Sequence, residues 1–232
     1  MNHYKKGFTL IELMLAMSFI SVLLLAIAMT VIQISNIYNR GLTLKEVNQA
    51  GRSLTTELQR SIAVGSSFPI DYPAPDSKYV KQTWGGRLCL GQYSYIWNYG
   101  KTLTGSPAAG FSNVYDASSS EKIRFIKVPD ATGNYCSAKA SAINPSGAVE
   151  LLNVGDRDLA LHSFSISNDP SASDSKTRQS LYYISFVIGT NDQAALDANQ
   201  AACKPPDVLT SDLNYCSVNQ FDIVARTGNA VQ

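Results

Sequence analysis

The most chemically unusual side chain in the sequence is Glu12, the single charged residue among the 33 positions from Gly7 to Asn39. Roughly 20 apolar residues are enough to cross a bilayer as a helix, so this run is long enough to do so. A carboxylate at the centre of a bilayer costs on the order of 2.5–3.5 kcal/mol, and such groups usually have a function. Because a buried anion needs a nearby cation, we expect Glu12 to pair with a positive group from a neighbouring chain.

Two lysines, Lys5 and Lys6, stand directly before the apolar run. Positive charge beside a membrane segment stays on the cytoplasmic side. The sequence therefore predicts a single-pass helix in the cytoplasmic (inner) membrane, with the N-terminus inside and the C-terminal part of the chain outside the cytoplasm.

The stretch Lys5-Lys6-Gly7-Phe8-Thr9-Leu10-Ile11-Glu12-Leu13 resembles the type IV prepilin family, the precursors of pilins and secretion pseudopilins. The specific match covers residues 5 to about 35. The resemblance implies that a prepilin peptidase cuts between Gly7 and Phe8 and that Phe8 is then N-methylated. It also implies that Glu12 neutralises the N-terminal amine of a neighbouring subunit during assembly.

Two other interpretations of this region are weaker. A secretory signal peptide would use Lys5 and Lys6 and a cleavage site at Ala26-Ile27-Ala28, but the apolar run continues to Ile34 and Glu12 does not suit such a segment. A plain membrane anchor leaves the glycine and the glutamate unexplained. The prepilin interpretation accounts for every one of these residues.

Other residues that could do chemistry form no recognisable motif. The sequence contains no G-x-S-x-G, no H-E-x-x-H and no phosphate-binding glycine loop, and of its two histidines His3 lies in the leader and His162 in a predicted strand. Four turn acids do not follow the calcium-loop spacing. We therefore predict a protein that is not an enzyme and that holds no metal and no cofactor; the acids are Asp156, Asp158, Asp169 and Asp174.

All four cysteines, Cys89, Cys136, Cys203 and Cys216, lie in the part expected to be exported. An even number of cysteines outside the cytoplasm indicates disulfides, with three possible connectivities. We favour the two pairs that close local loops, Cys89 with Cys136 and Cys203 with Cys216. Free buried thiols are the alternative.

The charge balance predicts no attraction to nucleic acid. The formal net charge of +1 becomes −1 when Lys5 and Lys6 are removed with the leader. A near-neutral chain has no electrostatic footprint for a polyanion.

The sequence predicts an α+β fold in three parts, a leader over residues 1–7, a helix over 8–62 and a β-rich domain over 63–232. Apolar residues recur at steps of three and four in the second half of the helix, which predicts one face packed on a sheet. Gly41 and Gly51 are expected to be weak points of this helix. The predicted face consists of Leu44, Val47, Gly51, Leu54, Leu58 and Ile62.

Period-two alternation of Tyr93, Tyr95, Trp97 and Tyr99 predicts a strand with one aromatic face. We favour packing in the core over an adhesive aromatic surface. Residues 191–202 are expected to form a short helix or a loop and 168–177 a polar hairpin connection. Five more antiparallel strands are predicted at 121–128, 149–154, 159–166, 181–188 and 221–225.

The layout of the C-terminal part resembles that of larger minor pilins and J-type pseudopilins. It implies a minor type IV pilin, a low-copy subunit of a surface filament; the alternatives are a type II secretion pseudopilin and a membrane-anchored adhesin or binding protein. The implied partners are other pilin or pseudopilin subunits, the prepilin peptidase, the inner-membrane assembly platform and, before assembly, membrane lipid.

Overall fold

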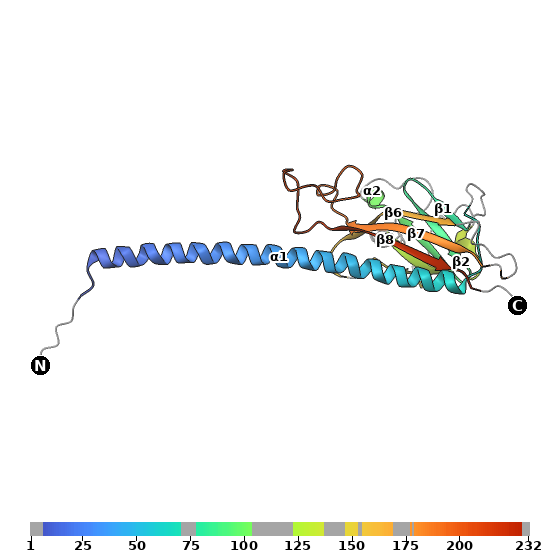
Figure 1. Ribbon diagram of the computed structural model, residues 1–232, viewed down its shortest axis with the longest axis horizontal. Coiled ribbons are helices and arrows are strands. Elements are labelled where there is room, and N and C mark those ends of the chain that lie inside the picture. The colour runs from blue at the N-terminus through green and yellow to red at the C-terminus, as the bar shows by residue number, and fades with distance from the viewer. Residues whose placement is uncertain are drawn as a thin grey trace, which may run out of the picture.

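The computed structural model describes residues 7–70, 78–103, 123–136, 147–152, 155–168, 177 and 179–228. A single long helix, α1, projects from a β-rich domain that contains two antiparallel sheets (Figure 1). The predicted α+β class is therefore confirmed.

Helix α1 runs over Leu10–Val64 without a break, two residues later at each end than predicted. The helix begins at Leu10 because Thr9 has an extended backbone and caps the helix with its side chain. Gly65 is the C-cap that follows Val64. In its second half the buried side chains recur at the predicted steps, with one correction: Leu44 is half-exposed. Thr43 is buried in its place, and its Oγ1 donates to the carbonyl oxygen of Asn214, 3.3 Å away.

The two sheets pack on a common core, and α1 lies along one side of the domain (Figure 1). Tyr99 and Leu161 form an isolated parallel bridge between them. The five-stranded sheet has the order β1 (Tyr79–Lys81), β2 (Gly85–Leu90), β3 (Tyr93–Asn98), β4 (Phe125–Pro129) and β5 (Val149–Glu150). The three-stranded sheet has the order β6 (Leu159–Asn168), β7 (Leu181–Thr190) and β8 (Val218–Arg226); the short helices are α2 (Gly100–Leu103) and η1 (Asn134–Cys136).

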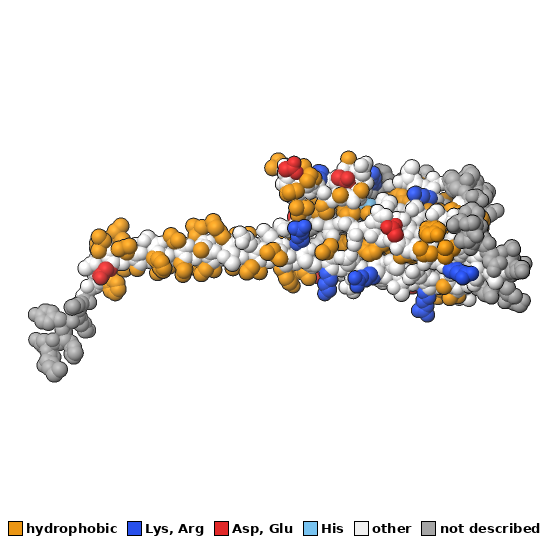
Figure 2. Space-filling model, in the orientation of Figure 1, with side chains coloured by type: hydrophobic (Ala, Val, Ile, Leu, Met, Phe, Trp, Pro, Cys, Tyr) orange, Lys and Arg blue, Asp and Glu red, His pale blue; other side chains and the backbone are white. Residues whose placement is uncertain are grey.

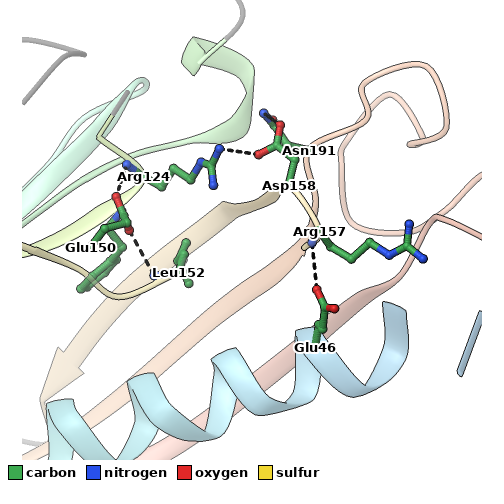
Figure 3. A network of polar contacts seen from close by, with 8 residues as sticks. Glu46, Arg124, Glu150, Leu152, Arg157, Asp158 and Asn191 are labelled. Atoms are coloured by element: carbon green, nitrogen blue, oxygen red, sulfur yellow. Dashed lines mark hydrogen bonds and ion pairs between the residues drawn. The ribbon is translucent and has the colours of Figure 1, made fainter. Parts of the chain in front are cut away.

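The last three predicted strands exist and are longer than predicted, because β7 pairs along both edges with β6 and β8. The strand predicted at 149–154 is shorter and covers only β5, with residues 153 and 154 outside the described part of the chain. The carboxylate of Glu150 explains the early end, since it accepts hydrogen bonds from the N–H groups of Phe125 and Leu152 at 2.9 and 3.1 Å. Figure 3 shows the Glu150 side chain bonded to the backbone of Arg124 and of Leu152.

Two predicted segments need a further statement. Residues 191–202 form turns and an isolated bridge between Leu196 and Cys203, so the loop alternative is the correct one. The predicted strand at 121–128 is found as β4, with 121 and 122 outside the described residues. The connection at 168–177 lies outside them as well, except for its two end residues.

The aromatic strand packs into the core, as the favoured interpretation predicted. Tyr95 and Trp97 are fully buried and Tyr99 is almost so. The ring centroid of Trp97 lies 5.5 Å from that of Phe125 and 4.5 Å from that of Phe164. Only Tyr93 is partly exposed, with the ammonium of Lys127 4.0 Å from its ring centre.

A partly buried carboxylate ties α1 to the five-stranded sheet. Glu57 Oε1 lies 2.6 Å from Lys127 Nζ and accepts a hydrogen bond from the Tyr95 hydroxyl at 2.7 Å. Burial alone would raise the pKa of Glu57, but the bonds from Lys127, Tyr95 and Ser61 outweigh it and lower that pKa. The carboxylate therefore stays ionised and contributes to the docking of the helix.

Gly51 is a point of close approach between α1 and the three-stranded sheet. A Cβ at this position would overlap the ring of Phe221 on β8, whereas a Cβ at Gly41 would meet nothing within 4 Å. The expectation that Gly51 weakens the helix considered helix propensity alone, whereas the absence of a side chain here also makes the space that Phe221 fills.

We predict that Gly51→Ala destabilises the detergent-solubilised protein by about 1–3 kcal/mol, since Phe221 must move from its site. Gly41→Ala is the matched control and should stabilise it by up to about 1 kcal/mol through helix propensity alone. Urea unfolding followed by tryptophan emission measures both. An equal gain in stability for the two variants would contradict the close contact.

Candidate functional site

The first turn of α1 forms a reciprocal capping box between Thr9 and Glu12. The N–H of Glu12 donates to Thr9 Oγ1 at 3.3 Å, and the N–H of Thr9 donates to Glu12 Oε2 at 2.9 Å. The hydroxyl of Thr9 also donates to Oε2, at 2.8 Å. The carboxylate is thus held against its own helix terminus, where the partial positive charge of the helix dipole stabilises it.

Both bonds that the carboxylate accepts end on one oxygen. Within the described part of the chain, Glu12 Oε1 accepts none. Glu12 can therefore bind a cation through Oε1 while Oε2 keeps the helix capped. Sequence reasoning missed the role of Thr9, although the T-x-x-E spacing from Thr9 to Glu12 is the signature of this motif.

The helix surface that follows the box is apolar and uncovered, as Figure 2 shows for the N-terminal half of α1. Ser18, Ser21 and Thr30 donate their hydroxyls to carbonyls three or four residues earlier, so they add little polarity to this surface. Among the described residues α1 is the one helix long and apolar enough to cross a membrane. Lipid or other helices must cover it.

The bond expected to be cut lies just before this helix. Gly7 and Phe8 precede the capped turn, both are exposed, and nothing lies within 4 Å of a Cβ built on Gly7. Lys5 and Lys6 lie outside the described residues. The structure thus brings Phe8 and Glu12 to one end of the chain, free of the β-domain.

The cysteines lie far from this end and join the two pairs that the sequence favoured. Cys89 on β2 is bonded to Cys136 in η1, and their Cα atoms are 6.1 Å apart. Cys203 is bonded to Cys216, with Cα atoms 5.9 Å apart, in the segment between β7 and β8. Asp130 lies close to the first pair, but both sulfurs are used by the disulfide and offer no metal site.

Two of the remaining candidate residues, His162 and Asp158, have structural partners, and Asp156 is exposed. His162 on β6 has Nε2 3.2 Å from the carbonyl oxygen of Thr190, and burial lowers the pKa of its imidazole. Asp158 forms an ion pair with Arg124 at 2.7 Å, seen in Figure 3. Asp169 and Asp174 lie outside the described residues.

Residues 2–32 match a family model described as the prokaryotic N-terminal methylation motif. This match supports a type IV prepilin-like protein. No match to a curated protein or to a solved structure was found. The motif implies a structural subunit that assembles with other pilin subunits and is processed by a prepilin peptidase. The apolar half of α1 in this prepilin-like chain fits single-pass membrane anchoring.

We predict that Thr9→Val frays the start of α1. The substitution removes the hydroxyl that accepts a hydrogen bond from the Glu12 N–H and donates one to the Glu12 carboxylate. Loss of an N-cap costs about 1 kcal/mol. Amide hydrogen exchange at Glu12 and Leu13 in detergent micelles should accordingly become roughly fivefold faster.

Thr9→Ser keeps a hydroxyl at the cap and is the matched control, with exchange close to that of the unaltered protein. Unchanged exchange in Thr9→Val would mean that the capping box does not hold this end of the helix.

Proposed function

We propose that this protein is a minor type IV pilin, a low-copy subunit that enters a surface filament and takes part in its assembly or function. The observation that carries the proposal is the capped carboxylate of Glu12 at the start of a long, uncovered apolar helix. A subunit that only needed an anchor would have no use for a charge at that place.

The proposed sequence of events follows the chain. Residues 1–7 form the leader, and Lys5 and Lys6 hold it at the cytoplasmic face. Cleavage after Gly7 removes both lysines and creates an amine on Phe8, which is then methylated. The helix keeps its cap throughout, because neither Thr9 nor Glu12 belongs to the leader.

Assembly then brings together the N-terminal ends of different subunits. The new ammonium of Phe8 lacks an anion, and Glu12 Oε1 accepts no bond within the described residues. Two subunits displaced along a filament axis place the amine of one beside the carboxylate of the other. In the dry bundle of apolar helices this pairing compensates the cost of burying each charge.

A J-type pseudopilin of type II secretion remains the second candidate, because the same motif and the same pairing serve that apparatus. The buried positions of Tyr95 and Trp97 remove the aromatic surface that favoured an adhesin. The identity of the neighbouring genes separates the first two: a retraction ATPase favours a pilus, and a secretin with secreted hydrolases favours secretion.

We predict that the mature protein begins at Phe8 with an N-methyl group, since Gly7 directly precedes the apolar helix. Mass spectrometry of the N-terminal peptide measures this. A bulky substitution such as Gly7→Leu should abolish cleavage and Gly7→Ala should only slow it, because the peptidase must accommodate the residue before the bond. A mature N-terminus at Met29 would instead show that signal peptidase cut after Ala28.

We predict that Glu12→Gln lowers incorporation into sheared filaments by about tenfold or more, which corresponds to a lost pairing of at least about 1.4 kcal/mol. Glutamine can still accept from Thr9 in the capping box, so this variant removes the charge and keeps the cap. Membrane insertion and cleavage should be unchanged.

Gln33→Leu is the control, because it makes the helix more apolar without removing a charge. Quantitative immunoblotting of filaments from cells expressing equal amounts measures incorporation. Equal recovery of Glu12→Gln and the unaltered protein would refute the pairing.

A further inference from the structure

The segment between β7 and β8, closed by the Cys203–Cys216 disulfide, lies beside the point where α1 leaves the domain. It reaches toward the N-terminal half of the helix (Figure 1). The Thr43 hydroxyl donates to the carbonyl of Asn214 at 3.3 Å. Arg40 also lines a cavity of about 300 Å³ together with both cysteines. The disulfide loop, residues 203–216, is therefore held at the level of residues 40–44 of α1.

The tip of the disulfide loop is apolar and fixed. Leu209 is fully exposed and Val208 is about two-fifths exposed. Lys204 Nζ donates to the carbonyl of Ala194 at 2.7 Å and to Thr210 Oγ1 at 2.8 Å, which holds the two sides of the tip together. Figure 2 shows hydrophobic side chains on the end of this projection that faces the bare half of α1.

The base of the disulfide loop is attached to α1 close to the expected membrane surface. A bilayer with its headgroups is about 40–45 Å thick, and at about 1.5 Å per residue a helix crosses it in roughly 27–30 residues. Counted from Phe8, the helix leaves the outer headgroups close to Tyr38. The disulfide loop is attached to α1 only a few residues later.

The side chains around this level are of the types found at membrane surfaces. Tyr38 is two-thirds exposed and Tyr215 is two-fifths exposed. The guanidinium of Arg157 lies 4.7 Å from the ring centre of Tyr215 and donates to Asn39 Oδ1 at 3.3 Å. Tyrosine is enriched where a membrane protein meets the headgroups.

We propose that Val208 and Leu209, at the tip of the disulfide loop, insert into the headgroup boundary of the outer leaflet while the subunit is anchored by α1. The contact fixes the tilt of the β-domain on the membrane before assembly. Two acids, Asp207 and Asp212, flank the tip. They limit its depth and favour a zwitterionic over an anionic lipid surface. The inference depends on the single-pass anchoring in the proposed function and not on the filament.

The test uses the full chain reconstituted into phosphatidylcholine vesicles, with ordinary or brominated acyl chains. Leu209→Trp places a fluorophore at the tip. Val224→Trp is the matched control, because Val224 is an exposed residue on β8 beside Gln59, farther along α1 from the membrane. The emission of the unaltered protein, which contains Trp84 and Trp97, is subtracted from both.

We expect the emission of Leu209→Trp to be shifted to the blue and reduced at least twofold by brominated lipid, and that of Val224→Trp to be unaffected. Equal emission of Leu209→Trp in the two lipids, from a chain that resists carbonate extraction, would overturn the lipid contact alone. A blue shift that grows with the protein-to-lipid ratio without bromine quenching would overturn it in favour of a second copy. Release of the unaltered chain by carbonate would contradict the anchoring itself.

Discussion

The packing of the second half of α1 on the three-stranded sheet is the contact on which the rest of the structure depends. The buried stripe from Val47 to Ile62 lies against the core that the two sheets share. It also fixes the direction in which the first half of the helix leaves the domain. One continuous helix thus lies in two environments. Its second half packs on the protein core, and its first half must be covered by lipid or by other helices.

The contact is specific because shape and charge act at separate points along it. At Gly51 the helix comes close enough for Phe221 to occupy the space of a side chain. Six residues later Glu57 forms an ion pair with Lys127, which comes from the other sheet. A rotation or a shift of α1 along its axis would break one of these contacts, so the register of the helix on the domain is set by both.

The sequence was sufficient for the long elements and for the apolar run that contains Glu12, because both depend on local patterns. The 33-residue run with one carboxylate, and the spacing of three or four between apolar residues, can both be recognised without any knowledge of the tertiary structure. The limits of β5 were not predictable, since they depend on where the Glu150 side chain finds backbone donors. The packing role of Gly51 was not predictable for the same reason: a glycine that costs helix propensity can be required by a ring that is 170 positions away in the sequence.

The continuity of α1 gives the subunit a mechanical property. Between Leu10 and Arg40 the helix contains neither proline nor glycine, so it has no preformed hinge. A load applied to the β-domain is therefore transmitted to Glu12 as tension along a stiff rod instead of being absorbed by local bending. The contacts at Gly51 and Glu57 carry that load as shear, and the N-terminal half of the helix carries it along its axis.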